Sequence, residues 1–232
     1  MAKRRIKKSV KIGLIIFAIL VVVIIIVIIG VGNYKKHQEY LASYEYKLSE
    51  LGYENDNLSY LLEQSDEIKN KILNMDYDDH IVDFGSGKGR IVFYINHFFR
   101  CSATGVEMNE IYYNESLLNK SKYIQKHKKM EDKVNFYCNL SQNYNVEEKD
   151  NKFYFFNPFS VQIFMKVIEN ILKSFEKNPR DMDLIIYYPS DEYIQFLEYR
   201  TPFMLENEII LEELYKNDDK EKFVIYSLKT NL

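Results

Sequence analysis

The sequence of 232 residues has little glycine, proline, histidine and cysteine. It contains 8 Gly and 4 Pro and shows no internal repeat, so we expect neither long disordered linkers nor a repeat architecture. The 4 His are scattered without metal-ligand spacing, and we therefore expect no metal site. Tryptophan is absent, and no serine or cysteine nucleophile motif is present.

Cysteine is also scarce, with 2 residues in the chain, and they do not predict a disulfide. Cys101 begins one predicted strand and Cys138 ends the next, so in a parallel sheet they lie on the order of 15 Å apart. A disulfide cannot span that distance. We therefore expect two buried free thiols, and the cysteines do not indicate the cellular compartment of the protein.

Acidic residues are absent from residues 1–11, which carry six Lys and Arg residues. Since the formal net charge of the whole chain is −3 and that of this tail is +6, the remainder carries −9. A strongly negative remainder disfavours nucleic acid as a partner.

Charged residues are absent from 12–31, a run of 20 residues that are nearly all Ile, Val and Leu. At 1.5 Å per residue a helix of this length spans about 30 Å, the thickness of a bilayer core. A cleaved signal peptide would have a shorter apolar region and small residues at a cleavage site, which this run lacks. We therefore expect a basic tail over 1–11 and a transmembrane helix over 12–32 that anchors the chain in the membrane lipid bilayer.

The rest of the chain predicts a stalk and one α/β domain. Residues 33–52 carry Tyr and Leu at helical spacing, so we expect a helical juxtamembrane stalk, and we assign 53–232 to the domain. Strands and helices alternate there, which favours a mostly parallel sheet with crossover helices. The predicted strands are 80–84, 101–107, 133–138, 153–156 and 183–188, followed by a closing antiparallel hairpin of 208–214 and 223–228. The predicted helices are 89–99, 109–127, 161–177 and 191–198.

Glycine is concentrated in the turn after the first predicted strand, where Gly85, Gly87 and Gly89 occupy alternate positions. Glycine permits positive φ and a close approach of the backbone to a ligand. The helix that follows would point N–H groups and a partial positive charge into the same space. A dinucleotide fingerprint requires G-x-G-x-x-G, and here the third glycine comes one residue early. The turn therefore predicts a loop for a nucleotide-like ligand and disfavours a nicotinamide-dependent oxidoreductase.

This turn, with Asp83 two residues before Gly85, resembles motif I of class I S-adenosylmethionine-dependent methyltransferases, an acidic residue followed by x-G-x-G-x-G. The resemblance implies a Rossmann-like methyltransferase fold with a C-terminal antiparallel hairpin, and S-adenosyl-L-methionine as the cofactor. It also implies that Glu107, at the end of the second strand about 20 residues later, contacts the ribose hydroxyls. The cofactor-binding residues that we expect are Asp83, Gly85, Ser86, Gly87, Gly89, Glu107 and Asn139. Of these, Asn139 stands near the position at which the family often has an acid that contacts the adenine amino group.

Asn157-Pro158-Phe159, after the fourth strand, resembles the motif that holds the amine in methyltransferases acting on nitrogen, and we take these three as the catalytic residues. It is also similar to the Asn-Asn-Phe of non-SET protein-lysine methyltransferases. The chain also resembles small bacterial membrane-anchored methyltransferases. It is similar as well to small lysine methyltransferases of membrane-bound ATP synthase c subunits, which pair an N-terminal membrane helix with a D-x-G-S-G-x-G-R loop like that of Asp83 to Arg90. The resemblance implies a nitrogen as the methyl acceptor, with a lysine of a membrane-associated protein as one candidate. Five aromatic residues, Phe155, Phe156, Phe159, Tyr187 and Tyr188, could line its slot or simply fill the core.

The side of the membrane on which the domain lies is a point of conflict. The excess of positive charge before the span predicts a cytoplasmic N-terminus and an external domain. A methyltransferase needs S-adenosylmethionine, which cells make and keep in the cytosol, and so we expect a single-pass cell-membrane protein with a cytoplasmic domain. The alternative is a non-catalytic membrane-anchored interaction module with a degenerate methyltransferase fold, which an external domain would favour.

Overall fold

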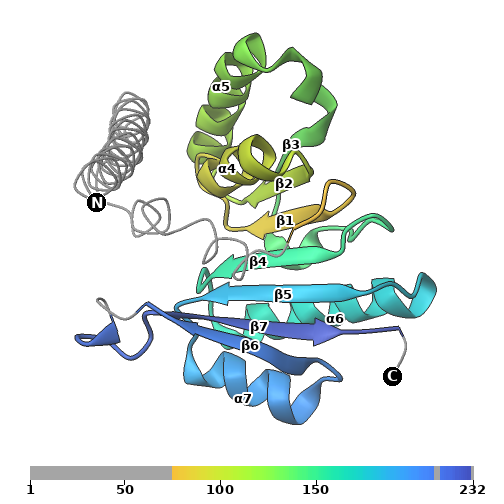
Figure 1. The fold of residues 1–232 in the computed structure, drawn as a ribbon, viewed down its shortest axis with the longest axis vertical. Helices are drawn as coiled ribbons and strands as arrows, with labels where there is room; N and C mark the ends of the chain where they lie inside the picture. Colours follow the sequence, from red (N-terminus) through yellow and green to blue (C-terminus); the bar gives the residue numbers. More distant parts are fainter. Residues whose placement is uncertain (1–74, 212–214, 231–232) are drawn as a thin grey trace, which may run out of the picture. The chain divides into compact units, whose positions relative to one another are not determined.

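The structure is a computed structural model that describes residues 75–211 and 215–230, which form a seven-stranded sheet flanked by helices (Figure 1). The tail, the transmembrane helix and the stalk predicted over 1–52 lie outside these residues. Within the described ranges, no helix is long and apolar enough to cross a membrane.

The strands are β1 (His80–Phe84), β2 (Ser102–Glu107), β3 (Val134–Cys138), β4 (Lys152–Phe156), β5 (Met182–Tyr187), β6 (Met204–Ile210) and β7 (Lys222–Leu228). The helices are α4 (Arg90–Phe99), α5 (Glu110–Lys126), α6 (Val161–Lys177) and α7 (Asp191–Arg200), with short 3-10 turns η1 (Lys128–Lys133) and η2 (Ser141–Asn143). The first five strands and all four helices lie within two residues of their predicted bounds. The start of β6 is a correction: it begins at Met204 rather than Glu208, because nearly every residue of this strand is exposed and no alternating pattern marks it.

The strand order is β3-β2-β1-β4-β5-β7-β6, and β7 pairs antiparallel with both β5 and β6. Neighbouring pairs among β1 to β5 are parallel, as predicted. The order reverses between β1 and β4, and in open sheets of this kind ligands bind beyond the carboxyl ends of the strands at such a reversal. The arrowheads of β1, β4 and β5 point to the same edge in Figure 1, which is therefore where a site is expected.

The two faces of the sheet carry different side chains. Val82 and Phe84 of β1 belong to the main hydrophobic core, which also contains residues of α6 and α7. Within that core, the rings of Phe164 on α6 and Tyr193 on α7 stack with centroids 3.8 Å apart. Because successive side chains of a strand point to opposite faces, Ile81 and Asp83 face the other side.

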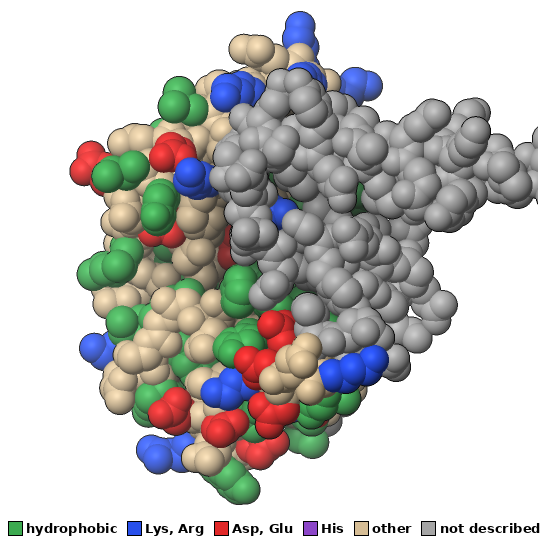
Figure 2. All heavy atoms as spheres, turned by 90° about the vertical axis from the view of Figure 1, so that its left-hand side faces the viewer, with side chains coloured by type: hydrophobic (Ala, Val, Ile, Leu, Met, Phe, Trp, Pro, Cys, Tyr) green, Lys and Arg blue, Asp and Glu red, His purple; other side chains and the backbone are tan. Residues whose placement is uncertain are grey.

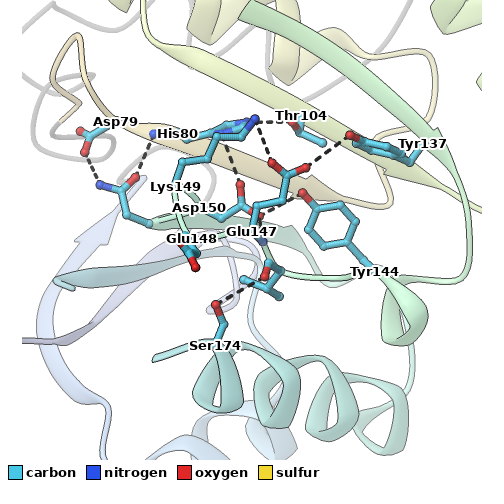
Figure 3. Close-up of polar contacts among 12 residues, drawn as sticks. Asp79, His80, Thr104, Tyr137, Tyr144, Glu147, Glu148, Lys149, Asp150 and Ser174 are labelled. Atoms are coloured by element: carbon cyan, nitrogen blue, oxygen red, sulfur yellow. Dashed lines mark hydrogen bonds and ion pairs between the residues drawn. The ribbon is translucent and has the colours of Figure 1, made fainter. Parts of the chain in front are cut away.

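A buried polar network lies at the opposite end of the sheet, around the start of β1 (Figure 3). His80 Nε2 is 2.8 Å from Thr104 Oγ1, and its Nδ1 is 3.2 Å from Asp150 Oδ1. The Tyr144 hydroxyl donates to Asp150 Oδ2 at 3.0 Å. Burial lowers the pKa of His80 to about 4, so the ring is neutral near pH 7. These contacts join β1, β2 and the segment before β4, away from the expected site.

A buried ion pair joins β4 to β5. Lys152 Nζ donates to Asp183 Oδ2, and both side chains are about nine-tenths buried. Breaking such a pair leaves a buried charge without its main partner.

We expect Lys152→Met to lower the free energy of unfolding by about 3 kcal/mol in urea titrations. Lys149→Met, at an exposed lysine, should change it by less than about 0.5 kcal/mol. Equal effects of the two substitutions would show that the Lys152–Asp183 ion pair does not stabilise the fold.

Candidate functional site

The loop between β1 and α4 has the backbone that its glycines predict. Gly85, Gly87 and Gly89 have φ values of 83°, 53° and 88°, a region that side-chain-bearing residues rarely adopt. The amides of Gly85 and Ser86 both donate to Val106 O, at 2.9 and 3.2 Å, which ties the loop to β2. Gly89 is the N-cap of α4 and no side chain caps it, so the positive end of the helix dipole is directed at the loop.

The loop is packed at both ends and open in the middle. A Cβ at Gly85 would lie 2.8 Å from Pro158 Cβ, and one at Gly89 would lie 2.4 Å from the Phe136 ring. A Cβ at Gly87 would meet nothing within 4 Å. The centre of the loop therefore faces space that a ligand could fill. The Gly85–Pro158 approach also brings the two motifs found in the sequence into contact.

Glu107 ends β2 directly beside this open centre. Its Oε2 accepts from the Gly87 amide at 2.9 Å, and its Oε1 accepts from the Asn109 amide at 2.7 Å. Each carboxylate oxygen has a second lone pair, so both can still accept from a ligand hydroxyl. The side chain is thus fixed by backbone donors in a position that suits a bidentate contact with a diol.

Two further polar side chains lie under the loop. Asp83 is in register with Gly105 of β2 and is 4% exposed. Burial, and then the charge of Glu107, raise the pKa of Asp83 to about 8. The Ser86 hydroxyl is buried and has no hydrogen-bond partner among the described residues. A Cβ on Gly105 would lie 2.6 Å from this hydroxyl, so Ser86 covers Gly105, the residue in register with Asp83.

The third strand end brings Asn139 to the same edge. Its amide donates to Glu107 O at 3.0 Å, and its Nδ2 lies 3.4 Å from Asn143 O. Met108 and Leu140, which follow Glu107 and Asn139, are 71% and 43% exposed. We did not predict a role for these two apolar residues, and their positions just after strand ends were the available signal.

Cys138 is exposed, contrary to our prediction, because β3 is an edge strand that pairs with β2 alone.

The Asn157-Pro158-Phe159 segment follows β4, next to β1. Asn157 is half-buried and has φ 38°, a strained conformation for a residue other than glycine. Phe159 packs against the core, with its ring centroid 6.3 Å from that of Phe155, and its carbonyl accepts from the Tyr193 hydroxyl. The structure therefore places Asn157 and Pro158 at the edge of the loop, whereas the ring of Phe159 contributes to packing.

The predicted aromatic slot is only partly formed. Phe155 is wholly buried in the core, since adjacent residues of a strand face opposite sides and Phe156 takes the other face. Phe156 is 42% exposed, and its ring centroid is 4.7 Å from that of Tyr187. Tyr188 has φ 53°, so the residues directly after β4 and β5 both have left-handed backbone conformations. Such strain is often found at functional sites.

Acidic residues of the β6–β7 connection hold these tyrosines. The Tyr188 hydroxyl donates to Asp218 Oδ2 at 2.5 Å, and that of Tyr187 donates to the Glu221 carboxylate. Figure 2 views this edge of the sheet, and Asp and Glu side chains gather in its lower part. Our sequence analysis missed Asp218 and Glu221, because a separation of about 30 residues left no local pattern to find. In the described ranges, no group of three or more His, Cys, Asp or Glu could hold a metal ion.

Comparison with known proteins identifies the fold. The sequence matches no protein-family model and no curated protein. An RNA methyltransferase from Salinibacter ruber, solved with S-adenosyl-L-homocysteine, is 14% identical with a TM-score of 0.51, over 73% of this chain and 95% of that one. A protein from Pyrococcus horikoshii is 10% identical with a TM-score of 0.54, over 75% and 92%. The cyclase SpnF is 10% identical with a TM-score of 0.52, over 70% and 79%.

The chain therefore has the α/β Rossmann-like methyltransferase fold, with a mostly parallel sheet and antiparallel C-terminal strands. At these identities the likeness establishes the fold, and one of the similar structures is named a cyclase rather than a methyltransferase. The reaction depends on the residues of the site and not on the fold alone.

The loop geometry predicts unequal effects of two similar substitutions. Gly89→Ala places a methyl group against the Phe136 ring at a positive φ, and we expect it to lower the free energy of unfolding by about 3 kcal/mol. Gly87→Ala meets open space and should cost about 1 kcal/mol for its φ alone. Thermal or urea unfolding measures both. If Gly87→Ala proved the more destabilising, the centre of the loop would not be open.

Proposed function

We propose that this protein is a membrane-anchored, S-adenosyl-L-methionine-dependent methyltransferase. The observation that carries the proposal is the arrangement of Gly87 and Glu107. An open, positive-φ loop and a backbone-anchored carboxylate lie side by side at the carboxyl ends of β1 and β2, next to the reversal of strand order between β1 and β4. A carboxylate suits ribose hydroxyls, and the loop suits the part of the ligand that must approach the backbone closely.

The residues at the strand ends fit the remaining parts of this cofactor. Asn139 offers an amide, and the exposed apolar side chains of Met108 and Leu140 offer surface for a flat purine. Asp83 and the Ser86 hydroxyl, which has no partner in the part of the chain that the structure describes, lie under the loop, where a polar amino-acid group could be bound. When bound, S-adenosyl-L-methionine supplies a methyl group on a positively charged sulfur, which a nucleophile takes by direct displacement.

The residues of the chain would align the acceptor and exclude water, which such a displacement chiefly requires. We propose a nitrogen acceptor, with lysine of a membrane-associated protein as the favoured case. In support, Asn157 stands next to the loop through Pro158, and its amide could accept from an amine N–H. The exposed ring of Phe156 against Tyr187 offers an apolar wall, which favours the neutral form of an amine.

Binding tests this function directly. We expect the full chain in detergent to bind S-adenosyl-L-methionine by calorimetry. Glu107→Ala should weaken binding about 10- to 100-fold, because a charged hydrogen-bond acceptor contributes roughly 1.5–3 kcal/mol. Glu110→Ala, at an exposed glutamate three residues away, should bind like the unaltered chain. Absence of binding by the folded chain would favour the non-catalytic interaction module instead.

The anchor and the location belong to the same proposal. We propose that 12–32 crosses the cell membrane once and that the domain lies in the cytoplasm, where the cofactor is found. The basic residues of 1–11 argue for the opposite side, so the orientation needs its own test.

Protease treatment of intact cells separates the two orientations. We expect the chain to stay with carbonate-washed membranes and its domain to resist protease until the cells are permeabilised. Digestion in intact cells would place the domain outside, away from its cofactor, and would contradict the enzymatic proposal.

A further inference from the structure

Three buried polar side chains form one cluster on the α4 side of the sheet. Asp83 is in register with Gly105, and Glu107 lies two residues further along β2, so both acids project to the face that Gly105 shares. The Ser86 hydroxyl covers Gly105 and has no hydrogen-bond partner among the described residues. Asp83, Ser86 and Glu107 are each at least nine-tenths buried.

The two acids of this cluster are not equivalent. Glu107 accepts two backbone N–H groups, which stabilise its charge. Asp83 has no ion pair with a described residue, and burial together with the nearby Glu107 raises its pKa to about 8. The other charged or titratable side chains on the surrounding elements are His80 of β1, Lys88 of the loop, Arg90, Tyr94 and His97 of α4, and Lys152 and Tyr154 of β4. Of these, Lys88 pairs with Glu115 at 2.7 Å.

We propose that Asp83 is protonated in the empty site and releases its proton to solvent when a ligand with an ammonium group binds under the loop. This inference rests on the proposed function, since S-adenosyl-L-methionine is such a ligand. A bound cation replaces the proton as the partner of the buried carboxylate, next to the Ser86 hydroxyl. Asp83 thereby selects a nucleoside that carries a positive charge over a neutral one, while the backbone-anchored Glu107 contacts either.

The sign of the pH dependence follows from this exchange. A nearby cation lowers the pKa of Asp83, so the complex holds fewer protons than the free protein and a proton leaves on binding. Affinity must therefore rise with pH up to the pKa of about 8 in the free protein. Between pH 6 and 7.5 the ionised fraction of a group with that pKa grows roughly twentyfold, and affinity should follow. An α-amino group with a pKa of about 7.7–8.0 is almost wholly protonated at pH 6 and about two-thirds protonated at pH 7.5, so the ligand's own titration reduces this rise only slightly.

Calorimetry of the full chain in buffers with different ionisation enthalpies measures how many protons are released when the ligand binds. For S-adenosyl-L-methionine at pH 6.5 we expect release of about one proton, together with the twentyfold rise in affinity from pH 6 to 7.5. Asp83→Asn should bind with no proton release and with a nearly flat pH profile. Glu169→Gln, at an exposed acid on α6, should behave like the unaltered chain.

Each result decides a separate point. Binding of S-adenosyl-L-methionine without proton release would overturn this inference and leave the proposed function standing. Release of the proton by the Asp83→Asn variant would assign it to another group and overturn the inference as well. Absence of binding at all pH values would contradict the proposed function, and the coupling with it.

Discussion

The hydrogen bond between the Gly87 amide and the Glu107 carboxylate is the contact on which the site depends. It joins the middle of the β1–α4 loop to the end of β2, and the second oxygen of Glu107 holds the start of the connection to α5. Gly85 and Ser86 add two further bonds to Val106, so the whole turn rests on β2. This arrangement requires glycine for two reasons. All three glycines have positive φ, and a Cβ at Gly85 or Gly89 would also clash with Pro158 or Phe136.

The same contact has an electrostatic consequence. It fixes a carboxylate within reach of a second buried acid, and Asp83 responds with a raised pKa. An arrangement that disfavours two negative charges in the empty protein favours a ligand that brings a positive one. Polar groups held under strain or without partners are costly in a folded protein and are commonly retained for binding. The Ser86 hydroxyl, which is buried over Gly105 and has no hydrogen-bond partner among the described residues, fits that interpretation.

Much of the fold could be predicted because its local signals agree. The buried strand β1, the glycine turn and the apolar pattern of α6 each indicate one structure. The sequence analysis also named Asp83, Glu107 and Asn139 at strand ends, and the structure brings these three to one edge. Prediction failed where the signal is not local. The exposed strand β6 has no alternation, and the partners of Tyr187 and Tyr188 come from a distant connection.

A crystal structure of the chain grown with S-adenosyl-L-homocysteine would test the central claim most directly. We predict electron density for the ligand against the Gly87 backbone, with its ribose hydroxyls on the Glu107 carboxylate and its purine next to Asn139. Density for the ligand at any other place, or a loop that remains empty at saturating concentration, would contradict the assignment of this site.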